Sequence, residues 1–156
     1  MKQLCVGLLA LLAGCTSVRT SVEIHAPAKD VRAVLFDFAD YPKWNPFIVR
    51  VDGTVAEGNR VNVTVKPVGR AEISGDTVVT LMTESRLSWR GSLAIPGLFR
   101  GKHDFIIDEA GPGTTVFRNN ERMGGLVVLF YDFKPTEAGF EAMNQALKKR
   151  AEAGAR

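Results

Sequence analysis

Two short segments of the chain carry the polar side chains best suited to act inside an apolar site. In one segment His103 alternates with Phe105. In the other, Asn119 and Glu121 follow Phe117 at alternate positions. Successive side chains of a strand point to opposite faces, so each polar group is expected on the face of an aromatic ring. We therefore expect His103, Asn119 and Glu121 to form a polar cluster that orients the polar end of a largely apolar ligand.

The protonation of Glu121 depends on its surroundings. A buried carboxylate is costly unless it is paired or protonated, so desolvation would raise its pKa and a neighbouring cation would keep the pKa ordinary. Structural roles stay open as well: Glu121 could cap the segment at residues 41–47 or pair with Arg90, and His103 could be a core or rim histidine. Acid–base chemistry by His103 and Glu121 on an enolisable ligand is a further alternative.

Other kinds of catalytic site have little support. The sequence shows no Ser-His-Asp or Cys-His arrangement and no phosphate-binding glycine loop before a helix, so we assign no catalytic residue. The two cysteines, Cys5 and Cys15, both lie near the N-terminus, and the two histidines, His25 and His103, are far apart. We therefore expect no metal site and no cofactor.

The net charge is too small for a nucleic-acid-binding protein. Twenty Lys and Arg against 17 Asp and Glu leave a formal charge of +3. The cations are scattered over different strand and loop segments. The one dense run, residues 148–150, lies in the last turns of a predicted helix, where cations favour the helix dipole. A phosphate or lipid-headgroup patch is the alternative for this run. We expect no nucleic-acid partner, and a monomer.

The N-terminus is typical of an exported protein. Residues 4–13 are largely apolar but too few to cross a bilayer, and Lys2 precedes them. The end of this run, Leu12-Ala13-Gly14-Cys15, resembles the lipobox of bacterial lipoproteins. The resemblance implies a signal peptide at residues 1–14, an acylated Cys15 as the membrane anchor and, with Thr16 after it, sorting to the outer membrane facing the periplasm. A plain secretory leader is the alternative. Residues 15–19 are then expected to be the lipid-anchored linker.

The rest of the chain predicts one α+β domain. Apolar residues alternate at 20–25, recur at helical spacing at 28–40, and alternate again in segments at 48–52, 61–66, 77–82, 86–93, 102–108 and 114–122. A brief helix is expected at 41–47, and a final helix after Pro135 carries the apolar stripe Phe140, Met143 and Leu147. Short glycine-containing turns between the strands indicate an antiparallel meander. A curved sheet would then cover the last helix, with an apolar pocket between them.

Several segments together resemble the SRPBCC superfamily, the START and polyketide-cyclase-like proteins. They include DFADYPKWNPF at residues 37–47, PGLFRGKHDF at 96–105 and NERMGG at 120–125. The resemblance covers about residues 20–152, leaving 153–156 as a tail. It implies the helix-grip fold, a curved antiparallel sheet of six or seven strands around a long C-terminal helix with two short helices after the first strand. It also implies a deep hydrophobic cavity, but not one activity.

We expect a membrane-anchored binding or carrier protein for a small hydrophobic or lipid-like ligand. The alternatives are a cyclase-like enzyme and an interaction module with a filled cavity. Leu98 and Phe99 are expected at the exposed tip of the loop at residues 95–101, where they would cover an entrance or touch lipid. Packing in the core is the alternative role for Trp44, Phe47, Trp89 and Phe99. The candidate ligand-contacting residues are Trp44, Phe47, Trp89, Leu98, Phe99, His103, Phe105, Phe117, Asn119, Glu121, Phe140, Met143 and Leu147.

Overall fold

The alternating segments of the sequence form one seven-stranded antiparallel sheet in the order β1-β7-β6-β5-β4-β3-β2. The computed structural model describes residues 14–154. The elements are β1 (Cys15–Ile24), α1 (Ala28–Leu35), the 3₁₀ turn η1 (Phe38–Asp40), α2 (Tyr41–Trp44), β2 (Ile48–Asp52), β3 (Arg60–Val65), β4 (Ile73–Met82), β5 (Arg86–Ser92), β6 (Arg100–Gly111), β7 (Thr114–Gly124), the 3₁₀ turn η2 (Leu126–Leu129) and α3 (Lys134–Gly154).

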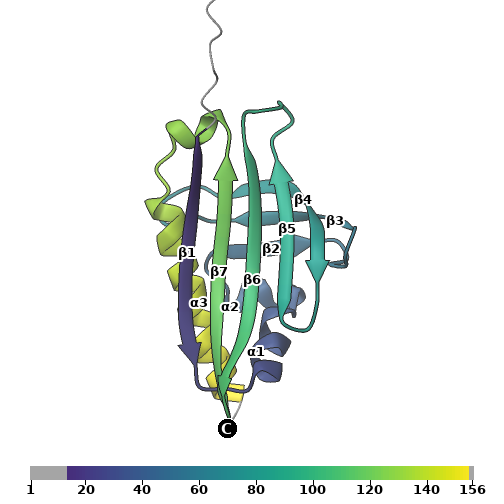
Figure 1. Cartoon of the computed structure of the whole chain (residues 1–156), viewed down its shortest axis with the longest axis vertical. Helices are drawn as coiled ribbons and strands as arrows, with labels where there is room; N and C mark the ends of the chain where they lie inside the picture. Colours follow the sequence, from purple (N-terminus) through teal and green to yellow (C-terminus); the bar gives the residue numbers. More distant parts are fainter. Residues whose placement is uncertain (1–13, 155–156) are drawn as a thin grey trace, which may run out of the picture.

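The strand order follows from the turns. Strands β2 to β7 form a meander because each pairs with the next along the chain, and β1 then closes the sheet by pairing with β7. The helix α3 lies along one face of the sheet, with the short helices α1 and α2 near it (Figure 1). This is the predicted helix-grip fold. We call the sheet face toward α3 the inner face and the opposite one the outer face.

The first strand corrects the predicted linker. Strand β1 begins at Cys15 rather than at Thr20, and Cys15 is the register partner of Gly124 at the end of β7. Residues 15–19 therefore belong to the sheet. The period of two continues through them, because Val18 is buried between exposed neighbours, but threonine and serine gave only a weak apolar signal.

Other boundaries also differ. The first helix ends at Leu35 and is followed by η1, so it is shorter than the expected 28–40. Strand β4 runs unbroken from Ile73, and the 3₁₀ turn η2 follows the end of β7. At the C-terminus, α3 continues to Gly154, two residues into the predicted tail. The predicted leader lies, apart from Gly14, outside the described residues.

The packing of α3 depends on a glycine. Phe140, Met143 and Leu147 are fully buried against the sheet. Next to them, the Phe47 ring lies directly over Gly139, where any Cβ would overlap the ring. The same ring meets Phe140 edge-on, with 5.0 Å between centroids. Phe47 therefore joins α3 to the short segment before β2.

We expect Gly139→Ala to destabilise the protein by about 1–3 kcal/mol, because overpacking forces the Phe47 ring away from α3. Urea unfolding would measure this. The control is Gly154→Ala in the same helix, where an added Cβ meets nothing within 4 Å. If both variants are as stable as the wild type, the close packing of Phe47 on α3 is wrong.

Candidate functional site

A cavity of about 330 Å³ lies on the inner face of the sheet, beside the first turn of α3. Apolar side chains dominate its wall, and they come from β3, β4, β5, the loop before β6, and the segment between β7 and α3. Among them are Phe47, Val63, Val65, Ile73, Trp89, Leu93, Phe99, Met123, Val127, Tyr131 and Phe133. His103 and Glu121 also line it, as does Asp76, whose exposed side chain lies 3.9 Å from Arg60.

Only part of the predicted site borders this cavity. Phe47, Trp89, Phe99, His103 and Glu121 line it. The predicted residues that do not are Trp44, Leu98, Phe105, Phe117, Asn119, Phe140, Met143 and Leu147. Most of these fill the space between the sheet and the middle of α3, where the aromatic side chains pack on one another. The described interior is therefore filled along the middle of α3, and this cavity lies at the N-terminal end of the helix.

Glu121 points into the cavity. It is the register partner of His103 on β6, so both side chains lie on the inner face. Its carboxylate lies over Gly101, since a Cβ there would come within 2.8 Å of Oε1. Among residues 14–154 no hydrogen bond or ion pair reaches the carboxylate, although the side chain keeps some exposure through the cavity. Desolvation without a compensating partner raises its pKa to about 7.

His103 is held neutral. Burial lowers its pKa to about 4, partly opposed by a hydrogen bond to Asn119 and by the charge of Asp104. The distance from His103 Nε2 to Asn119 Oδ1 is 2.6 Å. Because an amide oxygen only accepts, Nε2 carries the proton and Nδ1 is left as an acceptor. The ring also packs on Phe105 and Phe140, with centroids 4.4 and 4.9 Å away.

Asn119 belongs to a structural network rather than to the cavity wall. It is fully buried and donates to Asn144 Oδ1 on α3 at 3.3 Å. Asn144 in turn donates to Thr20 Oγ1 at 2.9 Å, and that hydroxyl donates to the backbone oxygen of Asn119 at 3.3 Å. The expected three-residue cluster is thus divided: Asn119 orients His103 and ties β7 to α3, whereas His103 and Glu121 border the cavity.

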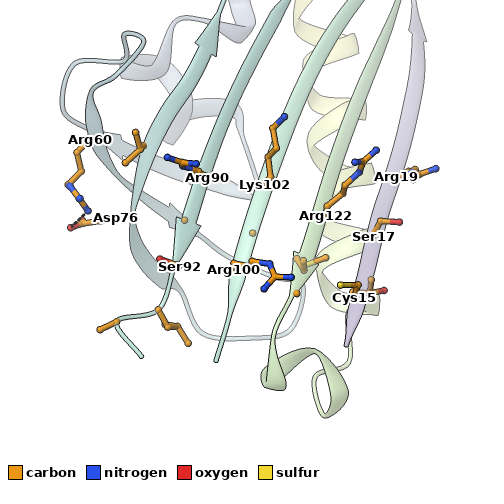
Figure 2. A pocket seen from close by; sticks show the side chains of 18 residues that line it. Cys15, Ser17, Arg19, Arg60, Asp76, Arg90, Ser92, Arg100, Lys102 and Arg122 are labelled. Atoms are coloured by element: carbon orange, nitrogen blue, oxygen red, sulfur yellow. Dashed lines mark ion pairs between the residues drawn. The ribbon is translucent and has the colours of Figure 1, made fainter. Parts of the chain in front are cut away.

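The structural alternatives for Glu121 do not match its position. Asn45 caps the segment after α2, because its Oδ1 accepts from the backbone N–H groups of Phe47 and Ile48 at 3.0 and 2.9 Å. Arg90 lies on the outer face, on the other side of the sheet from Glu121 (Figure 2). Neither role is therefore filled by Glu121.

The loop before β6 is folded back on the site. Leu98 and Phe99 are half-buried, not exposed as expected, because the N–H groups of Leu126 and Val127 donate to the carbonyls of Gly97 and Leu98 at 3.0 Å. Gly125, with φ +119°, allows this close approach, since a Cβ there would meet the Leu98 carbonyl. Phe99 lines the cavity, and Leu98 lines a separate hollow beside η2. The exposed apolar residue of this loop is instead Ile95, which is 64 % exposed.

No group of three or more His, Cys, Asp or Glu side chains in residues 14–154 could hold a metal ion. The same part of the chain contains no helix long and apolar enough to cross a membrane.

Residues 16–152 match the family model of polyketide cyclase / dehydrase and lipid transport proteins. The chain belongs to this family. No curated protein sequence is significantly similar to it.

Similar solved structures share the fold of this polyketide cyclase and lipid transport family. A START superfamily protein from Mycobacterium smegmatis has a TM-score of 0.63 at 21 % identity, covering 91 % of this chain and 97 % of its own. A protein of Deinococcus radiodurans has a TM-score of 0.62 at 20 % identity, covering 89 % of this chain and 99 % of its own. A point mutant of norcoclaurine synthase from Thalictrum flavum, in complex with a transition-state analogue, has a TM-score of 0.68 at 12 % identity, covering 92 % of this chain and 98 % of its own.

Sequence reasoning missed much of the cavity wall. Val63 and Val65 lie in the strand predicted at residues 61–66, but the alternation there does not by itself assign them to the site. Tyr131 and Phe133 lie between η2 and α3, where no periodicity indicated a direction. The pair of aromatic residues in a loop that precedes a proline was the available signal.

Glu121 should reduce folding stability as the pH rises. Its pKa is about 7 in the folded protein against 4.5 for the free group, so the folded state holds the proton more tightly than the unfolded state. The contribution of Glu121 to stability is then highest below pH 4.5, falls through the window from 4.5 to 7, and stays lower above it by up to about 3 kcal/mol. Urea unfolding should show Glu121→Gln about 1–3 kcal/mol more stable than the wild type at pH 8, with little difference at pH 4.5.

His103 acts in the opposite direction. Its folded pKa of about 4 lies below its ordinary 6.5, so stability is lost as the pH falls from 6.5 to 4. The wild type and the Glu121→Gln variant both contain His103, so the effect of His103 on stability largely cancels when the two are compared. Glu141→Gln, which changes an exposed carboxylate of α3, is the matched control and should match the wild type at both pH values. Equal stability of Glu121→Gln and Glu141→Gln at pH 8 would contradict the desolvation of Glu121.

Proposed function

We propose that the protein is a lipid-anchored binding or carrier protein for a small hydrophobic ligand with one polar end. The observation that carries the proposal is the apolar cavity of about 330 Å³ whose wall includes the ionisable groups of Glu121 and His103. Its volume falls at the lower end of the range for small-molecule sites, roughly 300–1,000 Å³. The family to which the chain belongs, which includes lipid transport proteins, supports a hydrophobic ligand.

The two ionisable groups favour a neutral, oxygen-bearing end on the ligand. Below pH 7 the Glu121 carboxyl is protonated and can donate a hydrogen bond to a carbonyl or hydroxyl oxygen. Neutral His103 offers Nδ1 as an acceptor for a hydroxyl. A ligand carboxylate would be disfavoured once Glu121 ionises, because two like charges would share a poorly solvated site.

The position of Cys15 supports the anchor. Cys15 begins β1 and pairs with Gly124 at the end of β7, directly before η2. The loop before β6 and η2 contribute Leu93, Phe99 and Val127 to the cavity wall, so the cavity reaches the end of the domain where Cys15 lies. An acylated Cys15 would hold this end against the bilayer, where an apolar ligand could pass between lipid and cavity without crossing water.

The protein should co-purify with a small apolar molecule, visible as added mass in native mass spectrometry. Val65→Trp places a large ring in the cavity wall and should remove that mass, because the ring occupies the ligand's volume. Lys66→Trp, at the exposed neighbouring position on the same chain segment, should retain it. Retention by both variants would contradict the cavity as the binding site.

Deuterium exchange of the co-purified molecule distinguishes the carrier from the cyclase-like alternative. Glu121, with a pKa near 7, is suited to move a proton at neutral pH. If the bound molecule takes up deuterium from D₂O at an enolisable carbon in the wild type and not in Glu121→Gln, catalysis is favoured over carriage. Binding without exchange supports the carrier.

Acylation of Cys15 should be directly detectable. In a bacterium that processes lipoproteins, the wild type should incorporate labelled palmitate and fractionate with membranes. Cys15→Ser should incorporate none, because the thioether cannot form. Ser17→Ala, two residues along the same strand, is the control and should be labelled like the wild type. An unlabelled wild type would refute the anchor and leave the ligand-binding proposal standing.

A further inference from the structure

A row of basic side chains crosses the outer face of the sheet. Arg90 on β5, Lys102 on β6 and Arg122 on β7 are successive register partners. Figure 2 shows the three on one face, with α3 behind the sheet. On the other side of Arg90 the row continues through Val78 of β4 to Arg60 of β3. Cations from four strands, distant in sequence, are thus gathered into one line.

Two more arginines extend this cationic row. Arg19 lies on β1 beside the row. Arg100 lies on β6, two residues before Lys102 and opposite Gly124. A broad depression of about 930 Å³ follows the row, and its lining contains six cations and a single carboxylate, Asp76. These cations lie in separate segments of the sequence, but the fold concentrates them on one surface.

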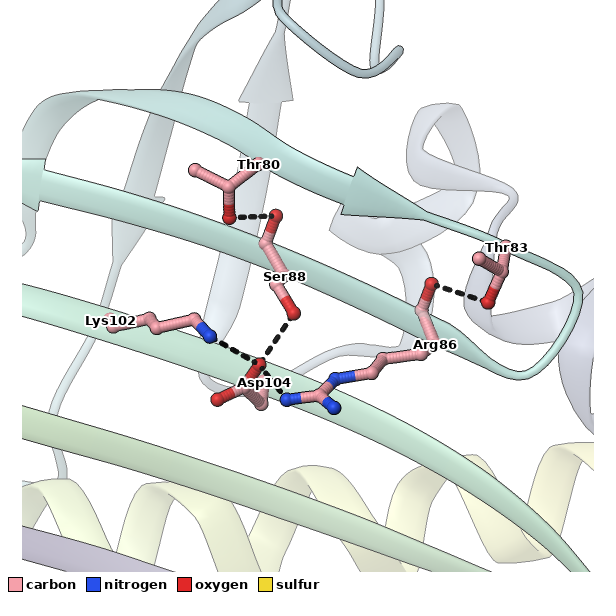
Figure 3. A network of polar contacts seen from close by, with 6 residues as sticks. All are labelled: Thr80, Thr83, Arg86, Ser88, Lys102 and Asp104. Carbon is pink, nitrogen blue, oxygen red and sulfur yellow. Dashed lines mark hydrogen bonds and ion pairs between the residues drawn. The ribbon is translucent and has the colours of Figure 1, made fainter.

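Nearby carboxylates neutralise only part of the row. The Asp104 carboxylate forms ion pairs with Arg86 at 2.8 Å and Lys102 at 3.5 Å, and it accepts a hydrogen bond from the Ser88 hydroxyl (Figure 3). Arg60 and Asp76 lie 3.9 Å apart.

The remaining arginines of the row lack such neutralisation. Within the described part of the chain, no ion pair or hydrogen bond involves the side chains of Arg19, Arg90, Arg100 and Arg122. Like charges directly opposite one another on adjacent strands destabilise a sheet. The row therefore opposes folding, and an anionic partner would relieve its repulsion.

The row stands next to an apolar end of the domain. Ile95, Leu129 and Phe130 there are 64, 53 and 88 % exposed. Cys15 is at the same end, because the Gly125 N–H donates to the carbonyl of Gly14 at 3.1 Å. Exposed apolar groups beside a cationic band match the two chemistries of a bilayer surface.

The spacing matches the layers of a bilayer. Cys15, Gly124 and Arg100 are in one line of the register, and Arg122, Lys102 and Arg90 lie two residues farther along their strands. Two residues span about 7 Å of strand. The polar layer of one leaflet is about 5–8 Å thick. With the apolar end in the hydrocarbon, the cations would lie at the depth of the lipid phosphates.

We propose that this end and the cationic row bind an anionic phospholipid bilayer, with Arg90, Arg100 and Arg122 contacting lipid phosphates. The inference deepens the proposed function, and rests on it only for placing a membrane beside Cys15. Binding by the row itself requires no acyl chain. The contact would fix the orientation of the domain and hold the cavity against the bilayer.

Vesicle partitioning tests this with the full chain carrying Cys15→Ser, so that no acyl group contributes. Phosphatidylglycerol-containing vesicles should bind it more tightly than pure phosphatidylcholine, and added salt should weaken only the former. Adding Arg90→Gln, Arg100→Gln and Arg122→Gln should lower partitioning to the anionic vesicles on the order of a hundredfold. Any contribution of residues 1–13 is the same in every protein compared.

The control carries Lys29→Gln, Lys66→Gln and Lys149→Gln, the same change in net charge at sites away from the row. It should bind much as the Cys15→Ser parent does. Urea unfolding should show the arginine triple variant at least as stable as that parent, which separates lost binding from lost folding.

Equal partitioning of the two triple variants would overturn the proposal. Binding of a short single-stranded DNA that depends on the three arginines, without a preference for anionic vesicles, would also overturn it in favour of a soluble polyanion. Absence of palmitate on Cys15 in cells would refute the anchor alone, and an empty cavity would refute ligand carriage alone. Neither result would change the vesicle measurement.

Discussion

The pairing of β6 with β7 is the constraint on which both surfaces of the protein depend. Its register places His103 opposite Glu121 on the inner face and Lys102 opposite Arg122 on the outer face. Because side chains alternate with a period of two, a slip of one residue would exchange the two sets. Cations would then enter the cavity, and a carboxylate and an imidazole would face the solvent. The phenylalanines at 105 and 117 secure the register, since a slip would expose both rings.

The interior between sheet and helix is divided into a filled part and a hollow part. Along the middle of α3, aromatic and aliphatic side chains pack closely, and the His103–Asn119–Asn144 hydrogen bonds join sheet to helix there. Toward the start of α3, Thr136 is the residue of the helix that borders the cavity, and the opposite wall comes from β3, β4 and the loop before β6. Folding stability can thus reside in one region, while the other remains open to a ligand.

The protonation of Glu121 makes the cavity sensitive to pH. His103 is kept neutral by burial, whereas Glu121 changes charge near neutral pH because nothing in the described chain compensates its desolvation. Gly101 leaves the room that this carboxylate occupies. A ligand that donates to or accepts from the carboxyl would replace the missing partner, so ligand binding and protonation should be coupled at this one residue.

The sequence alone determined the order and type of the elements, since periods of two and 3.6 residues and the turn glycines depend on local geometry. It also determined the inward direction of His103, Asn119 and Glu121, because parity within a strand is local. It did not determine that Phe105, Phe117, Phe140 and Met143 fill space while Val63, Ile73 and Tyr131 border a cavity, because a void depends on how distant side chains meet. Nor did it reveal the row from Arg90 to Arg122. Each of these cations looked isolated along the chain, and only the register between strands, a tertiary property, set them side by side.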